Sequence, residues 1–200
     1  MKKFLLIIIM LLSIQASNAQ VDTSGKEREV YNKEFKWQIK IPAGFENITD
    51  EQYAQLKKAG KDAMQKSTTA QIDSSTRRIF AFKNSKLNGF DSNYQYFDPK
   101  VFGDFKSSCK NEFDLMYKTL VAQMPAGAKI DTTISKEIIS NLTFQTFKAK
   151  AVISDRLQLN IQLYVRLFDK NVFTATIVYF DEKNGTLLQN AWKNSKFEQN

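Results

Sequence analysis

Leu-Gln-Leu-Asn-Ile-Gln-Leu-Tyr-Val-Arg-Leu, residues 157–167, alternates aliphatic side chains with polar or amphipathic ones along its whole length. Alternation with a period of two is typical of a β-strand that has one buried face. A second apolar run, Phe144 to Ile153, ends at Ser154-Asp155 just before it, and a third, Val172 to Phe180, begins after Asp169-Lys170-Asn171. Short turns join antiparallel neighbours, so residues 144–180 predict a three-stranded antiparallel meander.

Further strands and a helix are predicted before the meander. Residues 35–41 and 78–83 have strand patterns, and alternation over 130–134 indicates another strand. Thr49 followed by Gln52 has the capping-box spacing that begins a helix, here over 50–66. Residues 84–104 show no regular pattern, apart from a short strand expected near 94–97.

Two more helices are predicted, one in the middle of the chain and one at its end. The first is closed by Pro125 and Gly127, and the second follows Asn184-Gly185. Residues 172–180 are apolar on both faces, which indicates that neither face of the sheet is fully solvated. The sequence therefore predicts an α+β fold, an antiparallel sheet covered on both faces. The middle helix carries one largely apolar stripe: Phe105, Cys109, Phe113, Met116, Tyr117, Leu120, Val121 and Met124.

The N-terminus has the pattern of a secretory signal peptide. Lys2 and Lys3 precede the unbroken apolar run from Phe4 to Leu12, and small residues follow up to Ala19. The run is shorter than the roughly 20 apolar residues that a membrane helix needs. We expect a signal peptide over 1–19 that is cleaved after Ala19, a flexible leader over 20–28 and a single domain over 29–200. The mature chain is then periplasmic or secreted.

Composition excludes several classes of site. The chain has no histidine, so Ser-His-Asp, Cys-His and His-ligated zinc sites cannot form within it. Cys109 is the single cysteine, so no intramolecular disulfide forms, and it lies too far from Ala19 to carry a lipoprotein anchor. The formal net charge of +8 would favour anionic partners. Charges of mixed sign are nevertheless typical of an ordinary soluble surface.

The order of elements resembles the PsbP-like superfamily. The resemblance rests on the opening strand with its exit Ile41-Pro42-Ala43-Gly44-Phe45, the helix at 50–66, the meander at 144–180 and the closing segment 187–197. It spans about residues 28 to 198 and implies an α/β/α sandwich. The known activities of this superfamily are unrelated to one another, and include support of a photosynthetic metal cluster and regulation of a small GTPase. The resemblance therefore implies a fold and transfers no catalytic residue.

The candidate ligand-binding residues are aromatic side chains of the irregular segment. They could line a groove for a peptide, glycan or lipid, or they could pack a long loop onto the sheet. The Asn- and Asp-rich stretch from Asn88 to Asp104 does not have the spacing of a calcium loop, so no metal site is predicted. The candidate binding residues are Phe90, Tyr94, Tyr96, Phe97 and Phe102.

Other candidates have structural interpretations that we favour. Cys109 could be a reactive thiol, but its place on the apolar stripe predicts a core side chain. The basic residues Lys57, Lys58, Lys61, Lys66, Arg77 and Arg78 could form an anion-binding patch, although a solvated helix face is the default. Carboxylates could support hydrolysis without histidine, and the residues considered are Asp91, Asp98, Asp104 and Glu112.

These observations predict a non-enzymatic, exported binding or protein-interaction module of the bacterial cell envelope. Its partner would be a protein or an envelope component, with no nucleic acid, no membrane span, no lipid anchor and no cofactor, and we expect a monomer. Two alternatives stay open. One is a histidine-free hydrolase that acts on envelope glycans through paired carboxylates. The other is a protein that binds anionic surfaces and loses binding steeply with added salt.

Overall fold

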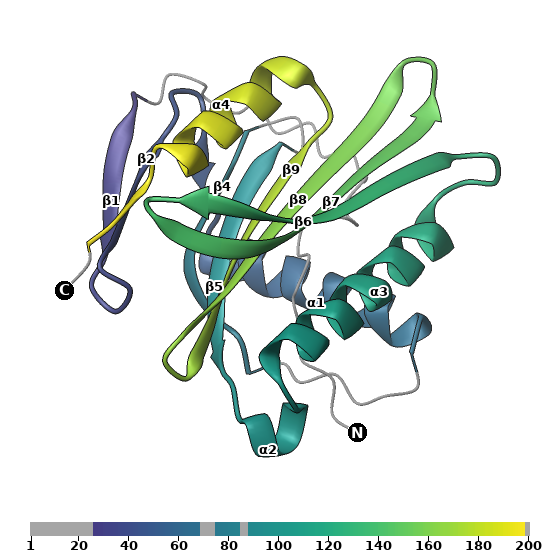
Figure 1. Cartoon of the computed structure of the whole chain (residues 1–200). Helices are drawn as coiled ribbons and strands as arrows, with labels where there is room; N and C mark the ends of the chain where they lie inside the picture. The colour runs from purple at the N-terminus through teal and green to yellow at the C-terminus, as the bar shows by residue number, and fades with distance from the viewer. Residues whose placement is uncertain (1–25, 69–74, 85–87, 199–200) are drawn as a thin grey trace.

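Seven strands form one antiparallel sheet through the middle of the protein (Figure 1). The computed structural model describes residues 26–68, 75–84 and 88–198, so the expected signal peptide and most of the leader lie outside the described residues. The strands, in their order across the sheet, are β3 (Glu46–Asn47), β4 (Arg77–Lys83), β5 (Gly89–Tyr96), β9 (Asn171–Tyr179), β8 (Leu157–Phe168), β7 (Leu142–Ser154) and β6 (Lys129–Ile139).

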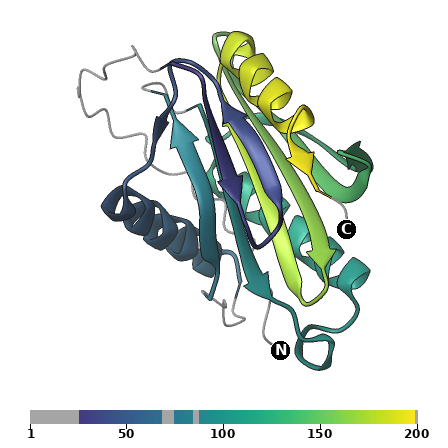
Figure 2. The ribbon, with the colours of Figure 1, turned by 90° about the vertical axis from the view of Figure 1, so that its left-hand side faces the viewer.

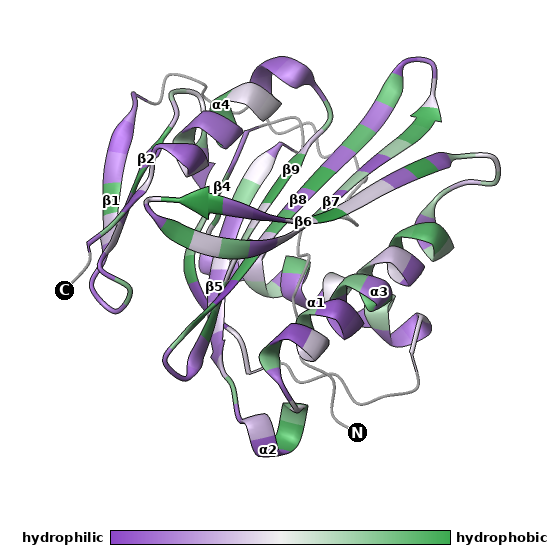
Figure 3. Ribbon diagram, in the orientation of Figure 1, coloured by the Kyte–Doolittle hydropathy of each residue, from purple (hydrophilic) through white to green (hydrophobic). Residues whose placement is uncertain are grey.

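The predicted meander is confirmed. Strands β7, β8 and β9 are neighbours in sequence and in the sheet, each antiparallel to the next, and β6 extends the series by one strand. Ser140 and Asn141, with φ of 50° and 64°, make the tight turn between β6 and β7. Two left-handed residues in a turn match the twist of the strands that the turn connects. Figure 3 shows hydrophobic and polar residues alternating along these strands.

Two helices cover one face of the sheet, α1 (Asp50–Lys66) and α3 (Phe105–Gln123), and the short α2 (Pro99–Phe102) precedes α3 (Figure 1). The predicted capping box of α1 is confirmed. The backbone N–H of Gln52 donates to the Thr49 hydroxyl at 3.2 Å, and the Thr49 N–H donates to the Gln52 side chain at 3.3 Å. Asp98 caps α2 and Asp104 caps α3.

The apolar stripe of α3 is only partly buried. Cys109, Phe113 and Met116 are in the core, but Tyr117 and Val121 are 43% and 46% exposed, so the predicted apolar stripe does not coincide with the buried side of the helix. The cause is that α3 also buries residues on the side of Cys109 that lies away from Tyr117 and Val121. The buried side of the helix is therefore rotated relative to the apolar stripe. The buried side chains on that flank are Ser108, Glu112, Leu115 and Thr119.

The other face of the sheet is covered by α4 (Glu182–Lys193) and by a small second sheet of β1 (Arg28–Asn32), β2 (Trp37–Ile41) and β10 (Lys196–Phe197) (Figure 2). Strands β1 and β10 were not predicted, because three of the five residues of β1 are polar and β10 has only two residues. The start of α4 also differs from the prediction. Asp181 caps the helix by accepting from the Asn184 N–H at 2.9 Å, so Asn184-Gly185 lies inside the helix.

Each face of the large sheet therefore has its own hydrophobic core. The core beneath α1 and α3 is mainly aliphatic and includes Leu159, Ile161 and Leu163 of β8. The core beneath α4 and the small sheet is rich in aromatic rings. The Trp37 ring packs edge-on to Phe173 at 5.1 Å and stacks on Phe197 at 5.6 Å. The α+β class with both faces covered is confirmed, with part of one cover made of strands.

Strand β5 is the main departure from the predicted order of elements. Residues 84–104 were expected to be irregular apart from a short strand near 94–97, yet the whole of Gly89–Tyr96 is an inner strand that pairs with β4 on one side and with β9 on the other. Its sequence looked like a loop because its helix-facing residues Asp91, Asn93 and Gln95 are polar, although all three are buried.

Candidate functional site

The five aromatic residues predicted to bind a ligand do not share one surface. Phe90, Tyr94 and Tyr96 alternate along β5 and so point to the face that carries the small sheet. Phe90 is fully buried there, whereas Tyr96 is 57% exposed. Phe97 and Phe102 stack on each other at 5.7 Å in the opposite core. Of the five, only Tyr94 and Tyr96 lie near one another and are accessible, at the C-terminal end of β5.

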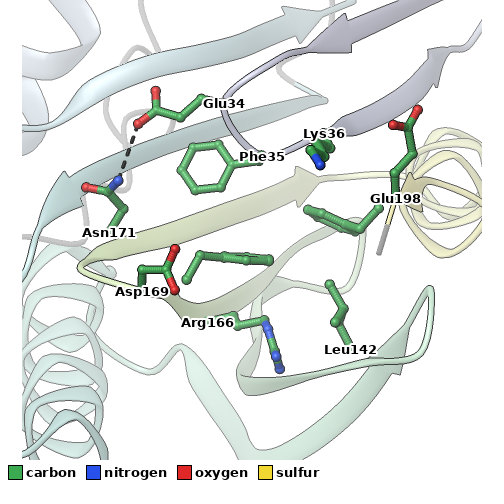
Figure 4. Close-up of a pocket in the computed structure, with 10 residues that line it drawn as sticks. Glu34, Phe35, Lys36, Leu142, Arg166, Asp169, Asn171 and Glu198 are labelled. Carbon is green, nitrogen blue, oxygen red and sulfur yellow. Dashed lines mark hydrogen bonds between the residues drawn. The ribbon is translucent and has the colours of Figure 1, made fainter. Parts of the chain in front are cut away.

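A pocket of about 350 Å³ opens beside these tyrosines, between the small sheet and the end of the large one (Figure 4). Several chain segments meet there: the β1–β2 turn, the start of β7, the β8–β9 turn and the residues around β10. The lining residues are Glu34, Phe35, Lys36, Leu142, Arg166, Phe168, Asp169, Asn171, Phe197 and Glu198. Sequence reasoning missed the pocket because no two of these segments are adjacent in the chain.

Aromatic rings form the base of the pocket. Phe35 packs edge-on against Phe168 at 5.4 Å, and Phe168 stacks on Phe197 at 5.5 Å with an interplanar angle of 22°. Phe35 and Phe197 are almost fully buried, while Phe168 is partly exposed to the pocket. Because these rings are also part of the aromatic core, their positions are fixed by packing on the core side.

The rim of the pocket is charged. Carboxylates come from Glu34, Asp169 and Glu198, and cations come from Lys36 and Arg166. Arg166 is held by the protein itself, since it donates to the Thr143 carbonyl at 2.7 Å and its guanidinium lies 5.3 Å from the centre of the Phe168 ring.

The carboxylates of the rim, Glu34, Asp169 and Glu198, form no ion pair within the described part of the chain. Glu34 accepts from the Asn171 amide at 3.3 Å, and Glu198 accepts from the Tyr31 hydroxyl at 3.4 Å. The rim therefore keeps carboxylate oxygens available for a cationic ligand.

Tyr94 and Tyr96 extend the pocket along β5. The Tyr94 ring packs edge-on to Phe35 at 5.2 Å, and its hydrogen bond to Glu34 is the largest cause of a raised pKa of the Tyr94 hydroxyl. Tyr96 is opposite Asn171 in the β5–β9 register, so the two side chains leave the sheet on the same face. The two tyrosines and the pocket form one continuous candidate binding surface, which we call the tyrosine pocket.

The carboxylates considered for hydrolysis lie elsewhere. Asp98 accepts from the Lys100 N–H and Asp104 from the Ser107 N–H, both at 2.9 Å, so these two act as helix caps. Asp91 is buried on β5 and Glu112 on α3. None of the four lines the pocket. Among the described residues, no three Asp, Glu or Cys side chains are close enough together to hold a metal ion.

Cys109 has the environment of a core residue. It is 3% exposed, and burial is the largest of the causes that raise the pKa of its thiol to about 12, followed by the nearby Glu112 and Asp104 carboxylates. A thiol with so high a pKa is protonated at neutral pH and is a poor nucleophile. The structure therefore supports the packing interpretation of this cysteine.

Some side chains of the predicted basic patch are bound by other parts of the protein and do not extend freely into solvent. Lys57 donates to the Thr76 carbonyl at 2.9 Å, and the guanidinium of Arg78 lies 4.6 Å from the centre of the Tyr53 ring and pairs with Asp50. Lys58 and Lys61 on α1 are left toward solvent. No helix among the described residues is long and apolar enough to cross a membrane.

Comparison with known proteins informs the fold. No known family profile matches the sequence, and no curated protein matches it. The fold is similar to the solution structure of cyanobacterial PsbP (CyanoP) from Synechocystis sp. PCC 6803, with a TM-score of 0.52 and 7% identity over 92% of this chain and 99% of that one.

Two further solved structures give weaker scores. One is a crystal structure from Bacteroides thetaiotaomicron VPI-5482, with a TM-score of 0.47, 9% identity and coverage of 88% of this chain and 49% of that one. The other is the Ran-binding protein Mog1p of Saccharomyces cerevisiae, with a TM-score of 0.45, 11% identity and coverage of 87% and 96%. The likeness to CyanoP carries the assignment: the chain has the PsbP-like fold.

Proposed function

We propose that this protein is an exported, non-enzymatic binding module that uses the tyrosine pocket to hold a cationic side chain of a peptide or protein partner. The N-terminal signal pattern supports export to the cell envelope. The observation that carries the binding assignment is the pocket itself, in which packed aromatic rings lie beneath carboxylates that form no ion pair with any described residue.

The chemistry of the pocket defines the class of ligand. Lysine and arginine side chains have an apolar stem and a cationic end, and such a stem can lie on Phe35 and Phe168 while the end meets Glu34 or Asp169. Aromatic faces also attract cations, by about 0.5 to 2 kcal/mol. Tyr96, exposed beside Asn171, offers an amphipathic contact to the segment that carries the side chain.

The pocket lining contains no histidine, cysteine, serine or threonine, so a nucleophile–base pair of the Ser-His or Cys-His type cannot form there. The chain lacks histidine, and the thiol of Cys109 is buried in the opposite core. The hydrolase alternative would need a carboxylate pair about 5 to 9.5 Å apart around a cleft. The carboxylates first considered for it are caps or buried residues outside the pocket, so no specific observation favours that alternative.

A calorimetric titration tests the proposal. The probes are the capped peptides Gly-Ser-Phe-Lys-Ser-Gly and Gly-Ser-Phe-Gln-Ser-Gly, which differ in one charge. We expect the lysine peptide to bind at least about tenfold more tightly, a difference of about 1.4 kcal/mol. The double substitution Glu34→Gln with Asp169→Asn should remove that preference, and Tyr96→Ala should weaken binding of both peptides.

Matched controls are available on the same chain. Asp155→Asn removes an exposed carboxylate from the β7–β8 turn, at the opposite end of β8 from the pocket, and should leave binding unchanged. Tyr117→Ala removes an exposed tyrosine on the other face of the sheet and should also be neutral. Equal binding of the two peptides by the unmodified protein, or equal loss in Asp155→Asn and the pocket variant, would contradict the proposal.

A further inference from the structure

The edge of the large sheet formed by β6 is long, regular and open. All 11 residues of β6 pair with β7, from Lys129 opposite Val152 to Ile139 opposite Leu142, without a bulge. No other described strand pairs with its outer side. The strand contains no proline. Proteins usually protect such an edge with bulges, prolines, charged side chains or a covering element, because its free N–H and C=O groups can pair with another strand. Strand β6 carries charges of both signs, Lys129, Asp131, Lys136 and Glu137, so a partner strand must match them.

Exposed apolar side chains gather beside this edge. Ile134 and Ile138 of β6 are 56% and 71% exposed, and Tyr117 and Val121 of α3 are the two residues that depart from the buried stripe. These are four of the nine large hydrophobic side chains that the described residues expose. Gathering of this kind marks an interaction surface more often than single exposed residues do.

The register places Ile134 and Ile138 on the face of the sheet that α3 covers. Ile134 is opposite Phe147 of β7, and the Phe147 ring stacks on Phe113 of α3 at 5.6 Å. Tyr117 and Val121 follow Phe113 by one and two helical turns, so they continue along the same side of α3. The opposite side of α3 is buried. We call Tyr117, Val121, Ile134 and Ile138 the edge patch.

We infer that a second copy of this chain pairs with β6 in an antiparallel, two-fold symmetric arrangement centred on Thr133. In that register Lys129 of one copy is opposite Glu137 of the other, at both ends of the joint, and Ile134 is opposite Thr132.

Other two-fold registers pair the charged residues of the two β6 strands less well. Like charges would face each other in registers centred on Asp131, Ile134, Lys136 or Glu137. No two charged residues would face each other in registers centred on Thr132 or Ser135. A register centred on Ile130 would also pair Lys129 with Asp131, but it would join only residues 129–131 of β6. The Thr133 register places opposite charges face to face and joins residues 129–137 of both copies.

The same symmetry brings both edge patches to one face of the joined sheet. A two-fold axis perpendicular to the sheet keeps α3 of each copy on the same side, so the two helices flank the joint. Tyr117 and Val121 of both copies would then border a strip of Ile134 and Ile138 side chains and remove them from water. This dimer differs from the monomer that the sequence led us to expect.

Sedimentation of the mature chain over a concentration series tests this arrangement. We expect a concentration-dependent dimer, and Ile134→Lys should raise its dissociation constant at least about tenfold by placing two charges at the joint. Leu187→Lys on α4, which changes an apolar residue that is 38% exposed on the other face, should leave the dimer intact. Circular dichroism melting confirms that each variant is folded.

Exchanging the charges of Lys129 and Glu137 tests whether these two residues face each other in the dimer, or whether any change of charge on β6 weakens it. Lys129→Glu should weaken the dimer because two carboxylates then oppose each other, and adding Glu137→Lys should restore it although this change also removes the Glu137–Lys148 ion pair within each chain. A monomer at every concentration would overturn the inference. So would a dimer that Ile134→Lys leaves unchanged, or crosslinks from residue 134 that reach only a different protein.

Discussion

Asp91 lies beneath α1 with 1% of its surface exposed, and burial raises the pKa of its carboxyl from 3.8 to about 7. A hydrogen bond from Asn93 at 2.9 Å, the charge of Arg78 and the nearby Tyr53 hydroxyl act in the opposite direction without cancelling the effect of burial. Its other oxygen has no hydrogen-bond partner among the described residues. The protonated carboxyl is therefore the form that the fold prefers.

We predict that Asp91→Asn stabilises the protein in a pH-dependent manner. Because the folded pKa is above the unfolded one, the contribution of Asp91 to stability is fully present below about pH 4 and is lost as the pH rises through about 7. Three pKa units correspond to an effect on the order of 4 kcal/mol. Urea unfolding of both proteins at pH 4 and pH 8 should show a gain for the variant at pH 8 and little gain at pH 4.

Asp104→Asn provides a control of opposite sign. Hydrogen bonds from Ser107 are the main cause of a lowered pKa of the exposed Asp104 carboxyl, so its stabilising effect is present above its ordinary pKa and is lost as the pH falls. This variant should be less stable than the unmodified protein at pH 8 and nearly equal to it at low pH. The same pH trend in both variants would contradict the assignment for Asp91.

Gly185 is a second position where a single added atom, a Cβ, should change the stability of the protein. A Cβ at this position of α4 would lie 2.4 Å from Cδ2 and 2.8 Å from Cγ of the buried Tyr179 ring. In an exposed helix, glycine to alanine is favourable by about 1 kcal/mol, but here overpacking should reverse the sign. We predict that Gly185→Ala lowers the free energy of unfolding by about 1 to 3 kcal/mol, whereas the neighbouring exposed Thr186→Ala has little effect. A stabilised Gly185→Ala protein would show that α4 moves freely on β9.

At the scale of elements, α1 depends on its first turn. Its capping box satisfies the N–H groups of Gln52 and Thr49, which have no partner within the helix. Thr49→Ala should therefore cost about 1 kcal/mol in urea unfolding. Ser67→Ala at the other end is the matched control, because the Ser67 hydroxyl has no hydrogen bond in the described structure and the cap there uses the backbone N–H. Equal losses in the two variants would argue against a specific role for the cap.

The elements that have a regular local sequence pattern were predictable from the sequence. Those that bury polar side chains, or that depend on a distant segment of the chain, were not. Strand β8 and helix α1 follow from alternation and from a capping box, since both depend on neighbouring residues. Only the end of strand β5 was predicted, near 94–97, and its first part was missed because Asp91, Asn93 and Gln95 are polar on a face that helices cover. Strand β10 has two residues and is held by β2, a segment more than 150 residues earlier, so no local signal marks it.

At the scale of the whole molecule, the tyrosine pocket is a product of tertiary structure. Its lining comes from segments between Glu34 and Glu198, which meet because the small sheet packs against the β8–β9 end of the large one. The aromatic residues of β5 were noticed from composition, and the structure places Tyr94 and Tyr96 of that group beside the pocket. The carboxylates of the rim could not be found in sequence, because isolated Glu and Asp residues in turns are common on any surface.

The location of binding is the most direct test of this account. We would follow backbone N–H resonances of the chain from Gln20 onward by NMR while adding the capped peptide Gly-Ser-Phe-Lys-Ser-Gly. The account predicts that the largest shifts fall on Phe35, Asp169 and Asn171, and that they are lost in the Glu34→Gln, Asp169→Asn double variant. Shifts centred on β6 or α1, or shifts at the pocket that persist in the double variant, would contradict it.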